Sequence, residues 1–214
     1  MRKGRPTDRL PRALYTRLPM SLPQPDLGVL RKAQKGDERA FSIIVRTYEQ
    51  PVFNYVLRLT GDRSLAEDLT QEVFLRVYQG LPSFSLRSRF TTWLFQVTKN
   101  RVLDELRALE RRPRAVVNLD DVPPLEVADA PAERSETIDA VWRAVEALNP
   151  DLKMALLLRD VVGLSYTEIA ETLEITLATV KWRIYKAREE VQLALHREGV
   201  VVPLPLRSAK TGTV

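Results

Sequence analysis

The stretch that decides the fold is residues 165–191, SYTEIAETLEITLATVKWRIYKAREEV. Ser165 and Glu168 form a capping box that opens a short helix. After a turn, a second helix begins near Leu177. Its apolar residues fall on one stripe, at Val180, Ile184, Ala187 and Val191. A short helix, a turn and a longer amphipathic helix predict a helix-turn-helix unit.

The second helix has a side opposite this stripe that is rich in cations and hydrogen-bond donors. Such side chains contact phosphates and base edges in a major groove. We expect this face to bind DNA through Thr179, Lys181, Trp182, Arg183, Lys186 and Arg188. The alternative is a solvated face whose cations pair with Glu189 and Glu190. Glu174 stands in the turn, where a positive φ would cost about 1 kcal/mol relative to Gly.

Upstream, residues 27–112 also show apolar spacings of three and four, which predict several packed helices. The expected boundaries are an N-cap at Asp37, a new helix starting at Pro51, an end at Gly61, and a capping box at Ser64 and Glu67.

Proline and charge separate these helical stretches from the rest of the chain. Residues 1–26 are rich in Arg and Pro and predict a disordered basic extension, with Met1 and Met20 both open as the start. Residues 113–134 predict an acidic, flexible linker, and residues 199–214 a tail. We therefore expect an all-α protein with two small helical domains, residues 27–112 and 135–198.

The composition narrows the classes of protein further. Among 214 residues, 33 Lys and Arg outnumber 28 Asp and Glu, a net charge of +5 that suits a polyanionic partner. There is no Cys and one His, which excludes disulfides and Cys/His zinc sites. No apolar run approaches the roughly 20 residues that span a bilayer, and no phosphate loop, nucleophile triad or metal-ligand cluster occurs. We expect a cytoplasmic protein without membrane insertion, cofactor, metal or enzymatic activity.

In the first helical stretch, Asp68, Gln71 and Glu72 fall at positions i, i+3 and i+4 of a helix. Leu69 and Val73 lie on its other side. The polar side chains therefore form one acidic patch, which suits a basic helical partner. An acidic first turn favoured by the helix dipole would explain Asp68 but not Gln71 and Glu72 as well.

The segment after this helix combines aromatics with arginines, a combination that can hold an unstacked base. The candidate residues are Ser83, Phe84, Ser85, Arg87, Arg89, Phe90, Trp93 and Asn100. Asn100 and Asp104 continue the face of Trp93 along the following helix. For Asn100, Asp104 and Arg107, a structural role is at least as good an interpretation as DNA contact: Asp104 would pair with Arg107, and Asn100 would satisfy buried backbone groups.

Three motifs, in this order, give the chain a resemblance to a known family. Ala66 to Tyr78, with the pattern Asp-x-x-Gln-Glu followed by an aromatic, resembles the polymerase-binding helix of extracytoplasmic-function (ECF) sigma factors of the sigma-70 family. Trp93-Leu94 with Asn100, Asp104 and Arg107 is similar to that family's promoter-melting segment. Tyr166 to Tyr185 resembles its domain-four helix-turn-helix.

The resemblance implies a transcription initiation factor that binds core RNA polymerase and promoter DNA and has an anti-sigma partner. By resemblance, region 2 spans residues 27–112 and reads the minus-ten element, region 4 spans 135–198 and reads the minus-thirty-five element, and the linker follows the RNA-exit path. The implied polymerase-binding residues are Asp68, Gln71, Glu72, Phe74, Leu75 and Tyr78. The departures at Glu174 and Trp182 concern which upstream sequence is read. The alternative is a stand-alone helix-turn-helix regulator, which would not bind the polymerase.

Overall fold

The computed structural model describes residues 22–111 and 132–200, and within these ranges every regular element is a helix. The first range holds α1 (Leu27–Gln34), α2 (Glu38–Thr60), α3 (Arg63–Gly80), the 3-10 turn η2 (Leu81–Ser83) and α4 (Phe90–Arg111). The second range holds α5 (Ala132–Glu146), α6 (Pro150–Asp160), α7 (Tyr166–Leu173) and α8 (Leu177–Arg197). The expected all-α class with two helical domains is confirmed.

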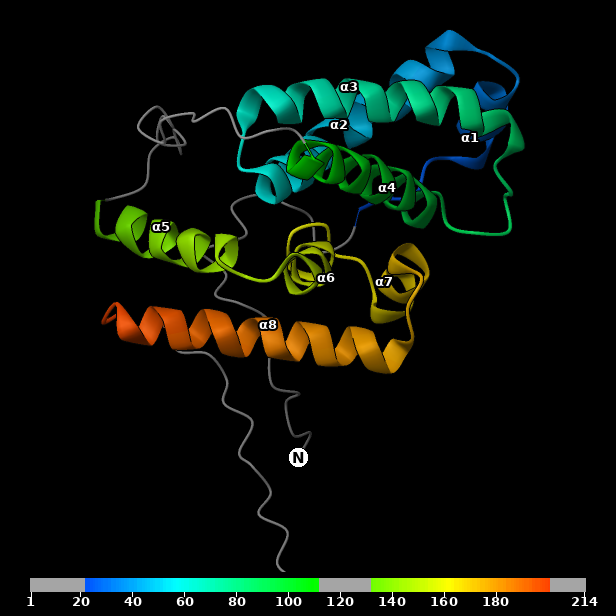
Figure 1. Ribbon diagram of the computed structural model, residues 1–214. Coiled ribbons are helices and arrows are strands. Elements are labelled where there is room, and N and C mark those ends of the chain that lie inside the picture. Colours follow the sequence, from blue (N-terminus) through cyan, green and yellow to red (C-terminus); the bar gives the residue numbers. More distant parts are fainter. Residues whose placement is uncertain (1–21, 112–131, 201–214) are drawn as a thin grey trace, which may run out of the picture.

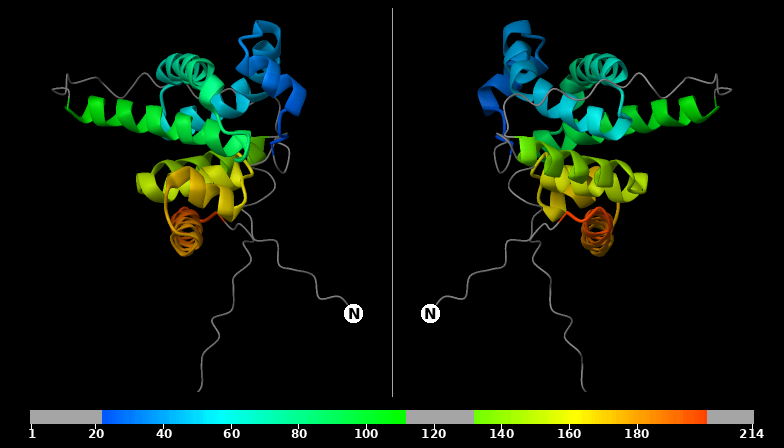
Figure 2. Two further views of the ribbon diagram at one scale, coloured as in Figure 1. Left: turned by 90° about the vertical axis from the view of Figure 1, so that its right-hand side faces the viewer. Right: turned by 90° about the vertical axis from the view of Figure 1, so that its left-hand side faces the viewer.

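The two helical units lie against each other. Figure 1 shows α2, α3 and α4 packed together above α5, α6 and α7, with the long α8 along the side farthest from α3. The turned views in Figure 2 show the same two layers, and α4 and α7 meet between them. No helix in the described part of the chain is both long and apolar enough to cross a membrane.

The first unit is built around a core of aromatic and aliphatic side chains from α2, α3 and α4. Tyr48, Tyr55, Leu69 and Phe95 are at most 1% exposed. Burying such large side chains removes the most apolar area from water, which is the main force holding these helices together.

Two of the expected helix boundaries in this unit are confirmed, and two are wrong. Asp37 caps α2 by accepting the N–H of Ala40, and Gly61 ends α2 in the left-handed conformation at φ 72°. The expected helix start at Pro51 is wrong, because α2 runs through it. Residues on both sides of this proline are buried in one core, and this packing outweighs the one hydrogen bond that proline removes.

The start of α3 also differs from the expected capping box. Asp62 is the N-cap and accepts the N–H of Leu65, so the helix begins at Arg63 and both Ser64 and Glu67 lie inside its first turns. Glu67 instead pairs with Arg63 at 3.0 Å. An Asp two residues earlier competes for the role of N-cap, and a carboxylate there also suits the positive end of the helix dipole.

The helix-turn-helix forms as its sequence predicts. Ser165 and Glu168 make both hydrogen bonds of the capping box, and the apolar stripe of α8 is buried to 1% exposure or less. Glu174, in the turn between α7 and α8, has φ 59°, the one positive φ of a non-Gly residue among those described. The expected strain at this position is therefore present.

The five residues before α1 belong to the folded part of the chain, although the sequence analysis assigned them to the N-terminal extension. Leu22 is 5% exposed, and the Pro23 carbonyl accepts a hydrogen bond from the Tyr48 hydroxyl. The remainder of that extension, the linker at 112–131 and the tail from residue 201 lie outside the described residues.

Candidate protein-docking and nucleic-acid interfaces

One face of α3 is exposed along most of the helix. It carries the expected polar patch of Asp68, Gln71 and Glu72 and continues into Leu75 and Tyr78, which are 57% and 40% exposed. We call these five residues the α3 stripe. Its two exposed apolar side chains, next to polar ones on the same helix face, form a surface that can dock another protein. Phe74, expected in the same set, is only 7% exposed and packs into the core beneath the stripe.

Glu72 ties the α3 stripe to α4. Its carboxylate accepts a hydrogen bond from Arg101 Nε at 2.5 Å, and Arg101 also pairs with Glu105 at 2.8 Å. The hydrogen bond from Arg101 lowers the pKa of Glu72, and the positive charges of Arg101 and Arg76 act in the same direction. Arg101 is only 11% exposed in its side chain, so Glu72 has a structural role within the unit.

The segment between α3 and α4 separates its polar residues from its aromatic ones. Ser83, Ser85, Arg87 and Arg89 are exposed, whereas Phe84 and Phe90 are 6% and 1% exposed. We call residues 83–89 the capture loop. Its exposed donors can meet phosphates and base edges, but the two phenylalanines present no surface on which a base could stack.

Trp93 and the two phenylalanines form an aromatic cluster beneath the capture loop. The Trp93 and Phe84 rings have centroids 4.8 Å apart, and Trp93 and Phe90 are 5.8 Å apart. Trp93 is partly exposed, so it is the one member of the cluster that can offer an aromatic edge to a ligand. Gly80 gives its ring room, because a Cβ there would lie 3.2 Å from Trp93 Cζ2.

Asn100 and Asp104 lie farther along α4 and are both exposed. The structural pair that the sequence offered as an alternative is present but long, with Arg107 Nη1 3.9 Å from Asp104. Asp104 lies closer to Arg76 of α3, at 3.6 Å. Because the Asn100 side chain is exposed, it can meet a ligand. It lies about 15 Å along the helix from the capture loop.

On the outward face of α8, two residues dominate the surface. Trp182 and Tyr185 are each 60% exposed, and Lys181 beside them makes no ion pair with any described residue. An exposed indole and phenol at successive helical turns form a surface that binds planar groups, sugars or methyl groups. Tyr185 lies on the face opposite the apolar stripe, as the helical spacing of the sequence predicts.

The other expected cations of α8 are held by carboxylates. Arg183 donates to Asp151 of α6 at 2.5 Å, and Arg188 makes a bidentate pair with Asp160, which is 5% exposed. Lys186 pairs with Glu189 at 2.8 Å, as the solvated-face alternative predicts. Thr179 bonds to Thr176, the N-cap of α8. The pairs of Arg183 and Arg188 tie α8 to α6, and Lys181 is the cation of this face that has no ion-pair partner among the described residues.

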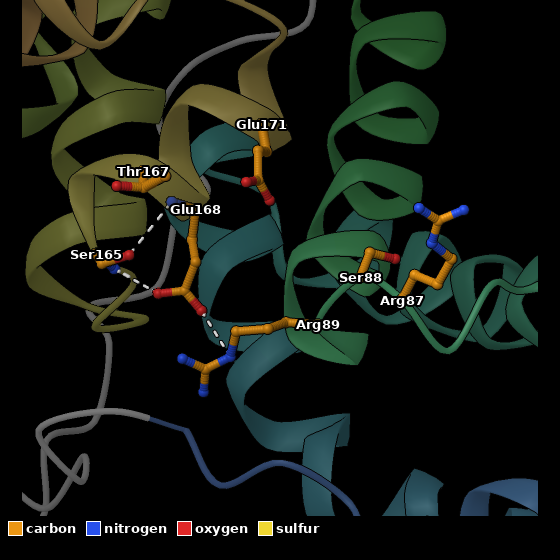
Figure 3. Close-up of a pocket in the computed structure, with 7 residues that line it drawn as sticks. All are labelled: Arg87, Ser88, Arg89, Ser165, Thr167, Glu168 and Glu171. Carbon is orange, nitrogen blue, oxygen red and sulfur yellow. Dashed lines mark hydrogen bonds and ion pairs between the residues drawn. The ribbon is translucent and has the colours of Figure 1, made fainter.

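The two units meet where α7 faces the capture loop. Arg89 Nε lies 3.0 Å from Glu168 Oε1, and Figure 3 shows Arg89 reaching from the start of α4 to the carboxylate. The surrounding cleft of about 450 Å³ is lined by Arg87, Ser88, Arg89, Ser165, Thr167, Glu168 and Glu171. Glu168, Glu171 and Glu174 are spaced at intervals of three on α7 and its C-cap. This acidic edge thus lies against a basic edge of the first unit, a pairing that the sequence analysis missed.

Three further contacts hold the units together. Glu174 accepts a hydrogen bond from Gln96 at 2.5 Å and lies 3.9 Å from the Lys99 ammonium. At the other end of the interface, the Arg58 guanidinium stacks 3.5 Å above the Trp142 ring. Burial lowers the pKa of Arg58 to about 10, against the attraction of Glu146 and Asp139, so the guanidinium stays charged at neutral pH.

Comparison with known proteins shows which family the chain belongs to. A model of sigma-70 region 2 matches residues 44–112, and a model of sigma-70 region 4 matches residues 138–191. The chain is 32% identical over 180 residues to RNA polymerase sigma-H factor of Pseudomonas aeruginosa, covering 79% of this chain and 93% of that protein.

The chain belongs to the sigma-70 family, as an ECF sigma factor.

A second relative supports the same subfamily. ECF RNA polymerase sigma-E factor of Escherichia coli is 35% identical to this sigma factor over 178 residues, covering 78% of this chain and 92% of that protein. The resemblance drawn from the three sequence motifs is therefore confirmed. The alternative of a stand-alone regulator is set aside, because sigma factors give RNA polymerase its promoter specificity.

Solved structures share the fold of this sigma factor. CnrH, in complex with the cytosolic domain of CnrY, matches with a TM-score of 0.61 at 22% identity, covering 79% of this chain and 96% of that chain. The sigma factor RpoE, in complex with the anti-sigma factor NepR from Bartonella quintana, matches with a TM-score of 0.60 at 21% identity, over 73% of this chain and 96% of that chain. At these identities the likeness concerns the fold.

Proposed function

We propose that this sigma factor uses three separate surfaces for the steps of initiation. The α3 stripe binds core RNA polymerase, the capture loop with Trp93 and Asn100 binds the minus-ten element, and the outward face of α8 binds the minus-thirty-five element. The observation that carries the proposal is the uninterrupted exposure of the α3 stripe on a helix whose opposite face is buried. A helix that only packs against its own domain does not need exposed apolar side chains such as Leu75 and Tyr78.

The α3 stripe has the chemistry of a docking site for a basic helical partner. Asp68 and Gln71 make no ion pair or hydrogen bond with other described side chains, so both are available to a partner. Leu75 and Tyr78 supply the apolar area that gives such an interface most of its affinity. Phe74 supports the stripe from below.

For the minus-ten element, the exposed donors of the capture loop are the proposed contacts. Arg87 has no ion-pair partner among the described residues, and Ser83 and Ser85 are exposed beside it. Arg89 would join them only after leaving Glu168, because one guanidinium cannot hold both the carboxylate and a phosphate in the same geometry. We therefore infer that the units move apart before α4 meets the promoter.

For the minus-thirty-five element, we assign direct contact to Lys181, Trp182 and Tyr185, with Thr179 and Lys186 at the edge of the same face. Arg183 and Arg188 take a positioning role, because both are engaged by carboxylates of α6 and its C-terminal end. Each interface alone is small, and a linker raises the effective concentration of the second contact once the first has formed.

Three further statements belong to the same proposal. The chain acts by binding and strand capture, and we assign it no catalytic step. It works in the cytoplasm, where its polymerase partner is. An anti-sigma protein controls it, as the solved complexes of proteins with this fold suggest.

The experiment that tests the assignment is run-off transcription with purified core polymerase on a promoter library. The double variant Asp68→Ala with Gln71→Ala should lose activity on every promoter, by at least about tenfold, the range of a truncated interface hot spot. The double variant Lys181→Ala with Trp182→Ala should lose activity only where a minus-thirty-five element is required. Glu72 and Arg183 are avoided, because their ion pairs would mix folding with binding.

Matched controls come from the same protein. Gln50→Ala removes an exposed amide from α2, and Lys35→Ala removes an exposed ammonium after α1. Both should transcribe like the unaltered protein. If the α3 double variant bound core polymerase with unchanged affinity, the docking assignment would be wrong, even if transcription fell for another reason.

A further inference from the structure

The capture loop is held at both of its ends by two glutamines from the N-terminal segment. Within the loop itself the hydrogen bonds are local: the Phe84 N–H donates to the Leu81 carbonyl at 3.1 Å, and the Ser88 N–H donates to the Ser85 carbonyl at 3.2 Å. Short turns of this kind leave a surface loop several conformations. Its shape therefore depends on what holds it from outside.

Gln34, the last residue of α1, bridges the entry to the loop. Its Nε2 donates to the Leu81 carbonyl at 3.1 Å and to the Phe84 carbonyl at 2.9 Å. The first carbonyl belongs to the first residue of η2 and the second to the residue that follows η2, so one amide group bonds to both and fixes the turn. The bonds join residues 47 and 50 positions apart and are partly buried. Without the Gln34 amide the Leu81 carbonyl keeps the Phe84 N–H, whereas the Phe84 carbonyl loses the donor that Gln34 supplies, which costs free energy at a partly buried site.

Gln24 fixes the exit of the loop. Its Oε1 accepts the N–H of Phe90 at 2.9 Å, and its Nε2 donates to the Thr91 hydroxyl at 2.5 Å. Arg89 precedes α4 and has no side-chain acceptor, so it cannot cap the helix itself. Gln24 supplies that cap from 66 residues away. The first turn of α4 and the side chains of Arg87 and Arg89 are thereby set relative to Trp93.

We propose that Gln34 and Gln24 are positioning residues for strand capture, holding the capture loop in the shape that binds the minus-ten strand. The inference rests on the proposed function of that loop. Neither glutamine needs to touch DNA. A rigid loop meets its ligand without first losing conformational entropy, whereas a loosened one pays that cost at each encounter.

Three substitutions at Gln34 separate this role from general stability. Gln34→Glu keeps the shape but turns an oxygen toward two carbonyls, Gln34→Met keeps the length without a charge or a donor, and Gln34→Lys restores a donor. Gln50→Glu is the matched control, because it makes the same change on the exposed face of α2. Thermal unfolding of each variant shows whether it folds, and Gln34→Met serves if the charged variant does not.

The measurement uses full-length protein in holoenzyme with core polymerase. Affinity for core, binding of duplex promoter and the rate of strand opening are measured separately, the last by permanganate reactivity of minus-ten thymines. Gln34→Glu and Gln34→Met should slow opening and weaken binding of a single-stranded minus-ten oligonucleotide by about tenfold, the effect of one or two lost hydrogen bonds. Core affinity should stay within about twofold, because the Gln34 amide bonds to the carbonyls of Leu81 and Phe84 and to no side chain of the α3 stripe.

The outcomes separate the two proposals. Partial recovery with Gln34→Lys and no effect of Gln50→Glu would support the positioning role. Normal opening by the Gln34→Met holoenzyme would overturn it, and so would equal losses in core affinity and in opening. Failure of the unaltered holoenzyme to open any promoter would instead count against the proposed function itself.

Discussion

The carboxylate of Glu168 holds two parts of the molecule at once. Its Oε2 accepts the Ser165 N–H at 2.8 Å, which completes the capping box of α7, and its Oε1 lies 3.0 Å from Arg89 Nε. One side chain therefore starts the first helix of the helix-turn-helix and also holds the loop that we assign to the minus-ten strand. Closure of the two units and promoter contact by Arg89 compete for the same guanidinium.

Glu168→Gln should open the contact between the units while leaving α7 folded, because Gln also serves at this position of a capping box. Ser165→Ala should do the reverse and weaken the cap, by about 1 kcal/mol, with the Arg89 pair intact. The chain has no Cys, so dyes on Ser42→Cys and His196→Cys can report the separation of the units by energy transfer. We expect lower transfer in Glu168→Gln than in Ser165→Ala, and a smaller salt dependence. Equal transfer in both variants would mean that the pair does not hold the units together.

Substitutions at Glu174 distinguish the effect of its contacts between the two units from the effect of its backbone strain. Glu174→Gly should relieve the cost of φ 59°, worth about 1 kcal/mol, and should lose the contacts to Gln96 and Lys99, an exposed group worth at most about 1 kcal/mol. We expect thermal stability to be equal or higher and the separation of the units to increase. Glu174→Asn is the comparison, since Asn tolerates the left-handed conformation without reaching α4. A large fall in melting temperature for both variants would show that the contacts outweigh the strain.

Because Arg188 pairs with the buried Asp160, we expect its substitution to lower stability strongly, although the sequence predicted a DNA contact at this position. Arg188→Ala should cost about 3 kcal/mol, because it takes the guanidinium from a buried carboxylate. Lys181→Ala, on the exposed face, should cost less than about 0.5 kcal/mol. Urea unfolding measures both.

A double variant then tests the positioning role of Arg188. Replacing the pair with apolar residues, Arg188→Met with Asp160→Leu, should recover most of the stability. We expect binding of the minus-thirty-five element to recover with it. Recovered stability without recovered binding would instead place Arg188 in direct contact with DNA.

The Glu72–Arg101 hydrogen bond makes part of the stability depend on pH. Because folding lowers the pKa of Glu72, its contribution is present above the unfolded-state pKa of about 4.3 and is lost as the pH falls through the lower folded-state pKa. The difference in unfolding free energy between the unaltered protein and Glu72→Gln should be at most about 1 kcal/mol at pH 7, since the pair is partly exposed. It should shrink toward zero on acidification. In an Arg101→Gln background most of this pH dependence should disappear, and only the part due to the charge of Arg76 should remain. An undiminished pH dependence in that background would show that Arg101 is not its source.

The sequence by itself determined the helices, the order of the motifs and the family. Helical periodicity, the Ser165–Glu168 capping box and the Asp-x-x-Gln-Glu pattern are local signals, carried by residues within one or two turns of each other. For the same reason the exposed side of α3 and the buried stripe of α8 were predictable, since the spacing of polar and apolar residues fixes which side a helix turns inward. The left-handed Glu174 was likewise marked by its place in the turn.

Only the tertiary structure decided which candidate residues are available. Phe84 and Phe90 have the composition of a base-binding loop, yet they pack under Trp93, and Arg188 has the charge of a DNA contact, yet it is held by Asp160. The caps supplied by Gln24 and Gln34, and the ion pair of Arg89 with Glu168, join residues 47 to 79 positions apart. The periodicity of the sequence does not predict such partners, because the hydrogen bonds of a side chain depend on which helices pack together. Long-range packing is also the reason why α2 continues through Pro51.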